Sequence, residues 1–473
     1  MQTTRRDFLS FGTYGLGTTA LLSLLQRDTS AAAPSPAAAL PHYAPRAKRV
    51  IQICLVGGLS HLDSFDYKPS LEKFHGKSLQ SQEKPDIFFG QVGLLRKADF
   101  AFKQRGQSGL WISDLFPHIA SCADELTLIR SMMSDSANHT PALFVANSGF
   151  QFNGFPSLGS WIIYGLGSET DSLPAYVVLP DSQGGPNGGA SNWTSGFLPA
   201  QHQGVVLQGG DQPVRDLYPD RPIAKDANAA ASEFASLVNR RHMQRVGEES
   251  LLSARIRSYE LAAKMQLSVP EVSDMSDEPE HIKAMYGLDN KTTADTGRRC
   301  LLGRRLLERG VRFVQIFSGG PLGGNPRPSW DGHENVKTNH EYQAAKLDQP
   351  VAALLEDLKQ RGMLDETLVL FTTEFGRTPF TQSAANQVGL GRDHNKYGFS
   401  VWMAGAGLKG GVSYGHTDDV GWKAAENPVP WYDFHATVLH LLGLNHEKLT
   451  FYHNGIQRRL TNVHGHVIKD ILA

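Results

Sequence analysis

Five short runs of apolar and β-branched residues predict buried β-strands. Each has the length of one strand and is apolar at most successive positions, which is typical of parallel strands covered on both faces. Other segments repeat apolar residues at helical spacing or begin with helix-start signals, and these predict helices. The expected strands cover residues 49–56, 126–130, 311–317, 367–373 and 399–404, and the expected helices cover 229–267, 296–309, 341–362 and 433–442. A helix that leads into a strand is a unit of a parallel α/β sheet.

Polar residues crowd the end of the strand at 367–373. Glu374 follows it at once, and further charged residues come within about one loop: Arg377, Arg392, Asp393 and His394. Ligands bind beyond the carboxyl ends of strands in open α/β sheets. Carboxylate oxygens and an imidazole nitrogen suit zinc, manganese or a similar divalent ion. For any one of these residues alone, a helix cap or a loop salt bridge is the better explanation, but five of them at one strand end favour a site.

The strand at 311–317 ends in a similar way. Asp331 and His333 follow it, and His340 comes a little later. The helix at 341–362 then leads to the strand that precedes Glu374. A right-handed crossover between parallel strands predicts that the two strand ends are neighbours.

The first strand, 49–56, runs into Gly57 and Gly58, followed by His61 and Asp63. Glycines directly after a strand allow a tight turn or the close approach of a ligand. His61 and Asp63 are therefore candidate metal ligands. Capping of the next helix by Asp63 is an equal alternative.

A helix start is predicted after the strand at 126–130. Pro141 suits the first turn of a helix, so His139 and Thr140 lie at or just before its N-terminus. Backbone N–H groups at that position attract anions, which suits a nucleophile or a phosphate ligand. Ordinary capping by Asn138 or Thr140 is the alternative.

Residues 1–40 resemble an export leader rather than part of a fold. Arg5 and Arg6 form a twin-arginine pattern, and a short, glycine-containing apolar run and an Ala/Pro/Ser tract follow. That run is too short for a stable membrane span, although an uncleaved anchor is the alternative. We expect export by the twin-arginine route to the periplasm or the outside. Residues 41–473 are expected to form a single domain with a long loop insertion near 181–225.

Composition excludes several classes of function. The chain has 46 basic and 47 acidic residues and a net charge of −1, which gives no electrostatic case for binding nucleic acid. Its three cysteines, Cys54, Cys122 and Cys300, exclude a disulfide framework and a cysteine zinc cluster.

These motifs, in this order, resemble a known family. The match includes Gly57-Gly58, Asn138-His139, the segment 310–315, Glu374-Phe375-Gly376-Arg377 and Gly391-Arg392-Asp393-His394. It is similar to the exported, sulfatase-like family called domain of unknown function 1501, within the alkaline phosphatase and sulfatase superfamily. The resemblance implies an alkaline-phosphatase-like α/β fold, with a mostly parallel sheet between helices, a divalent metal ion (zinc, calcium or manganese) and a small-molecule or glycan ester as substrate.

Three positions depart from the sulfatase pattern. His139 stands where sulfatases carry the nucleophilic cysteine, Phe375 replaces a histidine ligand, and Gly57-Gly58 falls where paired aspartates are expected. The resemblance therefore supports two hypotheses. One is a metal-dependent hydrolase of sulfate or phosphate esters, and the other is a non-catalytic protein that binds sulfated or phosphorylated glycans.

In the hydrolase, the metal ligands are drawn from seven candidates: Asp331, His333, Glu374, Asp393, His394, His61 and Asp63. Arg377 or Arg392 clamps the anion. His139 is a ligand, a general acid or the nucleophile, and Thr140 is the rival nucleophile. The field of the helix N-terminus is expected to keep His139 neutral.

Overall fold

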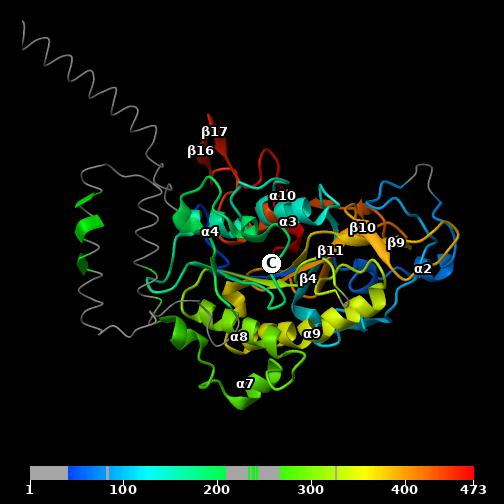
Figure 1. The fold of residues 1–473 in the computed structure, drawn as a ribbon, viewed down its shortest axis with the longest axis horizontal. Coiled ribbons are helices and arrows are strands. Elements are labelled where there is room, and N and C mark those ends of the chain that lie inside the picture. The colour runs from blue at the N-terminus through cyan, green and yellow to red at the C-terminus, as the bar shows by residue number, and fades with distance from the viewer. Residues whose placement is uncertain are drawn as a thin grey trace, which may run out of the picture.

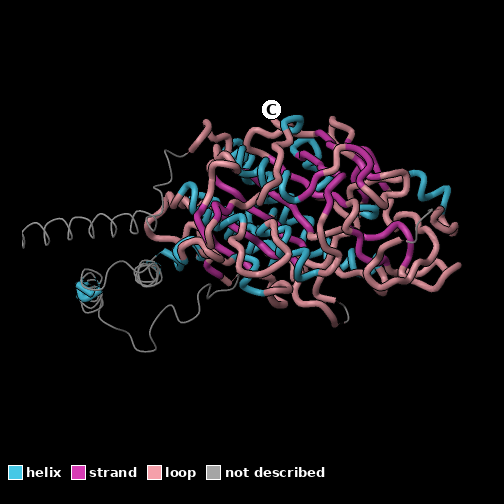
Figure 2. The backbone as a smooth tube through the Cα atoms, turned by 90° about the horizontal axis from the view of Figure 1, so that it is seen from above, coloured by secondary structure: helices cyan, strands magenta, loops and turns pink. Residues whose placement is uncertain are grey.

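The computed structural model describes residues 41–80, 85–208, 268–324 and 327–473, with a few residues between 233 and 265. A central sheet lies between two layers of helices (Figure 1). Seen from above, helices and strands overlap, because this view looks through the stacked layers (Figure 2). The expected leader, 1–40, and most of the expected helical segment 229–267 lie outside the described residues.

Among the described residues the sheet has nine strands: eight in the order β12-β4-β11-β8-β1-β7-β5-β6, and β15, which also pairs with β4. The strands β1, β4, β5, β6, β7, β8, β12 and β15 run parallel, and β11 is antiparallel to both of its neighbours. In chain order they are β1 (Arg49–Leu55), β4 (Leu126–Met133), β5 (Tyr176–Leu179), β6 (Val205–Val206), β7 (Phe313–Ser318), β8 (Thr367–Thr373), β11 (Phe399–Ala404), β12 (Val412–Tyr414) and β15 (Val429–Pro430).

Helices cover both faces of this sheet. One face is packed by α3 (His139–Ser148), α4 (Leu158–Leu166) and α10 (Trp431–Leu441), and the other by α7 (Glu280–Met285), α8 (Ala294–Glu308) and α9 (Val336–Gln360). A short helix, α2 (Pro69–Phe74), lies apart from both layers.

The side chains of β1 alternate between the two faces. Ile51 and Ile53 join the core that contains α8 and α9, whereas Val50 and Cys54 join the core that contains α3, α4 and α10. This alternation has the period of two that a strand imposes. The apolar run of β1 is therefore continuous because both faces are buried.

Smaller two-stranded sheets surround this core. They pair β2 (Phe102–Arg105) with β3 (Leu110–Ser113), β9 (Gly376–Thr381) with β10 (Arg392–Asn395), β13 (His416–Thr417) with β14 (Ala424–Glu426), and β16 (Phe451–His453) with β17 (Ile456–Arg458). The β9–β10 pair follows β8 directly, so it stands at the carboxyl edge of the main sheet.

The expected fold class is confirmed: the sheet is mostly parallel and lies between helices. All five expected strands and the three expected helices that fall among described residues are present within a few residues of their expected bounds. One detail was wrong. The ends of β7 and β8 are not direct neighbours, because β1 pairs with both and separates them.

The described part of the expected long loop, 181–208, contains β6 and two short 3-10 helices. Trp193 in this loop is buried, and its ring centroid lies 5.7 Å from that of Phe317. It packs the core and offers no open platform for a ligand. All three cysteines are free thiols. None of the described helices combines the length and the apolar character needed to cross a membrane.

Candidate metal centre

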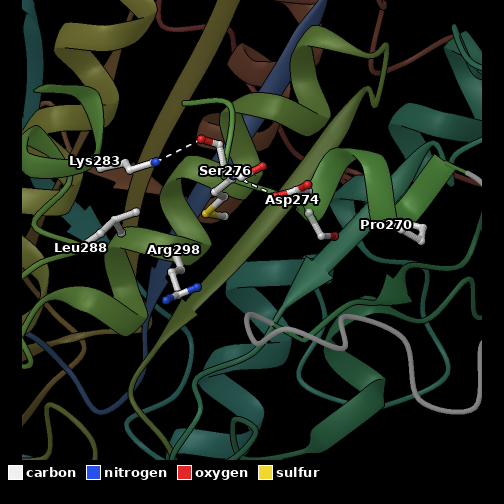
Figure 3. Close-up of a pocket in the computed structure, with 8 residues that line it drawn as sticks. Pro270, Asp274, Ser276, Lys283, Leu288 and Arg298 are labelled. Atoms are coloured by element: carbon white, nitrogen blue, oxygen red, sulfur yellow. Dashed lines mark hydrogen bonds between the residues drawn. The ribbon is translucent and has the colours of Figure 1, made fainter. Parts of the chain in front are cut away.

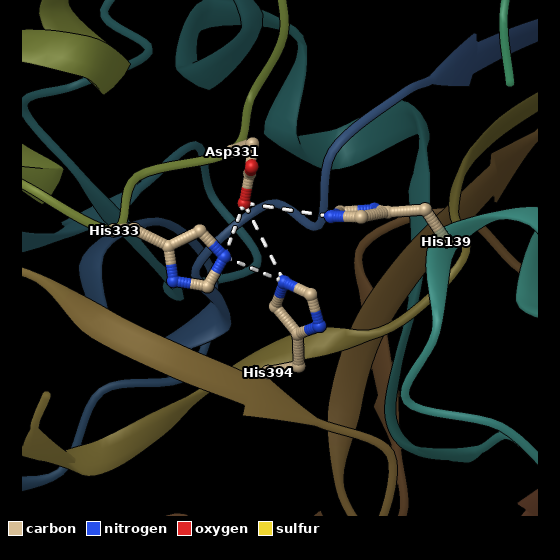
Figure 4. A group of neighbouring side chains, drawn as sticks. All are labelled: His139, Asp331, His333 and His394. Atoms are coloured by element: carbon tan, nitrogen blue, oxygen red, sulfur yellow. Dashed lines mark hydrogen bonds and ion pairs between the residues drawn. The ribbon is translucent and has the colours of Figure 1, made fainter. Parts of the chain in front are cut away.

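Four side chains from distant parts of the chain meet at the carboxyl edge of the sheet. His139 is the first residue of α3, Asp331 and His333 lie between β7 and α9, and His394 lies on β10. One ligand atom of each lies within 4.8 Å of the other three (Figure 4). These side chains keep only 1–8 % of their surface exposed.

The parallel sheet explains why these residues meet. The strands β4, β7 and β8 run in the same direction, so the segments that follow them emerge at the same edge. The segment after β4 carries His139, the segment after β7 carries Asp331 and His333, and the β9–β10 pair after β8 carries His394.

Each histidine turns its Nδ1 atom outwards to a hydrogen-bond acceptor. His139 Nδ1 lies 2.8 Å from Glu374 Oε1, His333 Nδ1 lies 2.5 Å from Gln382 Oε1, and His394 Nδ1 lies 2.5 Å from the Ala137 carbonyl oxygen. A carboxylate and a carbonyl oxygen only accept, so these Nδ1 atoms carry the proton. The Nε2 atoms are left to face the centre of the cluster.

The three Nε2 atoms and Asp331 Oδ1 lie close together at the centre of the cluster. The Nε2 atoms of His333 and His394 are 2.9 Å apart. The distances from Asp331 Oδ1 to Nε2 of His333, His394 and His139 are 2.8, 3.4 and 3.5 Å. His139 Nε2 is buried and has no hydrogen-bond partner. Lone pairs on neighbouring nitrogens repel one another unless a cation lies between them, and these four residues could hold a metal ion.

Two guanidinium groups hold Asp331 in its ionised form. Arg377 Nη2 lies 2.8 Å from Asp331 Oδ1, and Arg327 forms an ion pair with Oδ2. Burial raises the pKa of Asp331, but the charge of Arg377 and the three neighbouring histidines outweigh it and hold that pKa well below its usual range. These groups therefore favour the carboxylate form of Asp331.

The histidines differ in their proton affinity. Burial lowers the pKa of His394 well below its ordinary value. Burial also lowers the pKa of His139, but the nearby Asp331 and Glu374 carboxylates outweigh it and raise that pKa. This direction is opposite to the one expected from the helix N-terminus. Two nearby carboxylates outweigh the partial charge of a helix end.

Glu374 orients His139 from outside the cluster. Its Oε1 atom accepts hydrogen bonds from His139 Nδ1 and from the Gly57 backbone N–H, both at 2.8 Å. A carboxylate that receives the outer N–H of a metal-binding histidine fixes the tautomer and the ring direction. The position predicted for Glu374, at the end of β8, is confirmed, and its contact with the cluster runs through His139.

The three positions that depart from the sulfatase pattern are closely packed beside the cluster. The Phe375 ring packs against His139 and His394, with centroids 5.0 and 4.4 Å apart. Gly57 and Gly58 have φ values of 120° and 80°, and an added Cβ would lie 2.5 Å from the Asp331 backbone nitrogen or 2.6 Å from the Phe375 ring. The close approach of these segments requires glycine, so aspartate ligands at positions 57 and 58 have no room.

The two arginines predicted to bind a substrate anion are instead bound to protein atoms. Arg377 and Arg392 are fully buried, and their donors are used by protein atoms. Arg377 Nε lies 2.8 Å from the Gly58 carbonyl oxygen, and Arg392 binds Asp63 and four backbone carbonyl oxygens. This burial corrects the expectation that either guanidinium binds a substrate anion.

Four predicted metal ligands lie outside the cluster: Glu374, described above, and three more. His61 Nε2 lies 2.8 Å from the Gly421 carbonyl oxygen. Asp63 accepts from Ser60 Oγ, the Asp99 N–H and Arg392. Asp393 accepts from the N–H groups of Phe89 and His394. Their hydrogen bonds hold loops in place, which is the structural alternative that the sequence left open for such residues.

Thr140 is half-buried, and its methyl group faces Gly188. The structure adds residues that the sequence did not single out: Gln382, which orients His333, Arg327, which contacts Asp331, and two phenylalanines, Phe88 and Phe89, that pack against the histidines. A lone Gln or Arg and a Phe-Phe pair in a loop carry no signal in the sequence, so only the fold shows them.

A hollow elsewhere contains none of these residues. It has a volume of about 490 Å³ and lies beside α7 and α8 (Figure 3). Its lining includes Lys283, which donates to the Ser276 carbonyl oxygen, together with Asp274 and Arg298. This pocket is separate from the four clustered side chains.

Similar solved structures were found, and no curated protein sequence matches the chain. A sulfatase from Pseudoalteromonas sp. is 13 % identical, with 85 % of this chain and 68 % of that one covered and a TM-score of 0.36. The TAB5 alkaline phosphatase, as a mutant, is 11 % identical, with coverage of 85 % and 99 % and a TM-score of 0.35. A phosphonate monoester hydrolase of Agrobacterium radiobacter is 12 % identical, with coverage of 84 % and 74 % and a TM-score of 0.35.

A family model described as "Protein of unknown function (DUF1501)" matches residues 47–472, almost the entire described chain, and the protein belongs to that family.

Proposed function

We propose that this protein is an exported, metal-dependent hydrolase of phosphate or sulfate esters. One observation carries the proposal: three histidines present Nε2 atoms to one carboxylate oxygen, Asp331 Oδ1, while their Nδ1 atoms are held from outside. Metal-binding histidines have this arrangement in proteins.

The donor set favours zinc or a similar transition metal ion. Three imidazole nitrogens and one carboxylate oxygen suit zinc, whereas calcium takes six to eight oxygen ligands. Calcium is therefore the weakest candidate of zinc, manganese and calcium. A single ion is proposed, because Phe375, Gly57 and Gly58 provide no ligands for a second one.

The charges around the cluster suit an anionic substrate. Asp331 and Glu374 are carboxylates, and Arg377 and Arg327 are cations that pair with Asp331, so these four groups sum to zero. A bound divalent ion makes the site positive. Such an ion polarises an ester oxygen and lowers the pKa of water.

Arg327 is the proposed anion-binding residue. Its side chain is 21 % exposed and contacts Asp331, whereas Arg377 and Arg392 are fully buried. Its planar guanidinium matches two oxygens of a phosphate or sulfate group. Arg327 also pairs with Glu334, which is 69 % exposed, so a substrate anion competes with a weak surface contact.

Export rests on the sequence of the leader. Arg5-Arg6 and the following apolar run support the twin-arginine route to the periplasm or the outside. That route carries folded proteins, which agrees with a metal centre assembled from four distant segments.

The number of protein ligands favours a second function. Four protein ligands complete a tetrahedral zinc shell, and catalytic zinc sites keep one position open. If the ion keeps all four ligands, the centre is structural and the protein is a non-catalytic binder of sulfated or phosphorylated glycans. Catalysis requires a five-coordinate ion or the release of one ligand.

One experiment separates the two functions. The protein is purified from its natural compartment, its metal content is measured, and it is tested against phosphate, sulfate and phosphonate esters. About one ion per chain with turnover of an ester supports the hydrolase. One ion per chain without turnover of any ester, but with binding of sulfated glycans, supports the binder. Absence of any bound metal, together with failure to take up zinc, would overturn both.

A further inference from the structure

Two adjacent phenylalanines lie over the outer side of the candidate metal centre. The Phe88 ring is stacked on the His394 ring, with centroids 5.0 Å apart and planes inclined by 26°. The Phe89 ring stands edge-on to the His333 ring at 4.8 Å. The two phenylalanine rings are themselves 4.9 Å apart and perpendicular. Together they form an aromatic corner that rests on two of the four ligands.

This corner is exposed to a degree that folding alone does not explain. Phe88 is 45 % and Phe89 is 51 % exposed, whereas Phe375, which also packs on His394, is fully buried. Burial of a phenylalanine ring is favourable, so each exposed ring gives up part of that stabilisation. Exposed apolar groups at the mouth of a polar site often contact a ligand.

Polar contacts hold the corner in place. The Phe89 N–H donates to Asp393 Oδ2 at 2.9 Å, and Tyr397 OH donates to Asp86 Oδ2 at 2.6 Å. Asp393 and Tyr397 flank His394 in the chain. The loop with the aromatic corner is thus anchored to the same short segment that carries a candidate ligand, so the rings and the ligand keep a fixed relation.

The other sides of the centre are closed by protein. His139 is covered by Phe375 and joined to Glu374, and Asp331 is covered by Arg377. Arg327 and the aromatic corner, by contrast, both reach the surface. An anion that contacts the ion and Arg327 therefore directs its organic group along the Phe88 and Phe89 rings.

We infer that Phe88 and Phe89 are the subsite for the organic group of the substrate, and that they select esters whose organic group is a ring, aryl or sugar, over esters of small alkyl alcohols. This inference rests on the proposed function. Aromatic rings bind flat apolar faces by stacking and by edge-on contact, and each such contact adds to the gain from simple burial. A methyl or ethyl group is too small to cover both rings.

The test compares ring and alkyl probes on the zinc-loaded, full-length protein. Phenylphosphonate and methylphosphonate carry the same anion and are not esters, so their dissociation constants measure the subsite without turnover. Phenyl and ethyl phosphate measure it through KM and kcat. The variants are Phe88→Ala, Phe89→Ala and the conservative Phe89→Tyr. The control is Phe152→Ala, which removes a ring that is 73 % exposed in the loop between α3 and α4.

The expected result is a change in selectivity. The natural protein should bind phenylphosphonate more tightly than methylphosphonate, and each alanine variant should reduce that preference by about 3- to 10-fold, the range that one aromatic contact supplies. If the protein hydrolyses esters, the alanine variants should have a higher KM for phenyl phosphate. Phe89→Tyr and Phe152→Ala should keep the preference. Zinc content is measured for every variant, so a weakened metal centre is recognised separately.

The outcomes separate this inference from the proposed function. Phosphonate binding with the expected selectivity but no ester turnover supports the subsite and contradicts the hydrolase. Turnover of esters with equal loss for phenyl and ethyl substrates in Phe88→Ala and Phe89→Ala contradicts the subsite and keeps the hydrolase. Equal affinity of the natural protein for both phosphonates, or no binding of either, also overturns the inference.

Discussion

His139 and Glu374 are 235 positions apart in the chain, yet His139 Nδ1 lies 2.8 Å from Glu374 Oε1. This hydrogen bond joins the first residue of α3 to the residue that follows β8. It directs His139 Nε2 towards the centre of the cluster, where this atom has no hydrogen-bond partner. Glu374 is therefore a positioning residue for the proposed metal ligand.

The first prediction concerns this positioning. Glu374→Gln removes the charge that fixes the His139 tautomer, and zinc affinity should fall by about 10- to 100-fold, the usual effect of losing such an outer partner. Competition with a chromophoric chelator measures the affinity. Glu341→Gln is the matched control, because Glu341 lies half-exposed on α9. Unchanged affinity in Glu374→Gln would contradict the positioning role.

The second prediction compares two neighbours. His139→Ala should abolish ester turnover and weaken metal binding, since it removes one of four ligands. Thr140→Ala should reduce kcat by less than about 10-fold, well below the loss expected when a nucleophile is removed. Single-turnover kinetics on both variants give the comparison. A larger loss in Thr140→Ala, with the metal retained, would identify Thr140 as the nucleophile instead.

The third prediction links the metal to folding. A ligand that binds only the folded state stabilises it by mass action, so chelation should lower Tm. In Asp331→Asn the metal content should fall from about one ion per chain towards none, and added chelator should then change Tm little. Differential scanning calorimetry with and without chelator measures this. His281→Ala, at an exposed histidine on α7, should behave as the natural protein does.

The fourth prediction concerns acid stability. His435 on α10 is fully buried, and burial lowers its pKa to about 4, although Nε2 donates to the Ala146 carbonyl oxygen. Because the folded-state pKa lies below the unfolded value of about 6.5, the unfolded state binds a proton first as the pH falls. Stability from this residue is complete above pH ~6.5 and falls by about 3 kcal/mol by pH ~4.

His435→Gln removes this titration and can keep the hydrogen bond to Ala146. The free energy of unfolding, measured in urea at several pH values, should therefore depend less on pH between about 6.5 and 4 in the variant. The value at neutral pH alone decides nothing, because the substitution also changes packing. An unaltered slope would show that His435 does not titrate as its burial requires.

The fifth prediction concerns export. Arg5→Lys together with Arg6→Lys should leave the protein inside the cell, because the twin-arginine pair is the recognition element of that route. Fractionation followed by immunodetection measures the distribution. Arg46→Lys, beyond the leader, is the control. Normal export of the double variant would exclude this route.

The hydrophobic pattern by itself determined the strands and the edge of the sheet at which the candidate metal centre lies. Runs such as 49–56 and 367–373 are apolar on both faces, and that pattern is specific for strands inside a parallel sheet. Because parallel strands end at one edge, the amino-acid sequence alone predicts that Asp331, His333, Glu374 and His394 lie together. Their close arrangement is what the structure shows.

The tertiary structure decided which of the candidates meet. His61, Asp63 and Asp393 have the same chemistry as the cluster residues and also lie near strand ends, but hydrogen bonds to Gly421, Arg392 and the loop at Phe89 hold them elsewhere. The direction of a side chain in a loop depends on contacts with distant segments, and periodicity says nothing about these. For the same reason only the fold shows that Arg377 is buried, that Gln382 orients His333, and that Phe88 and Phe89 cover the centre.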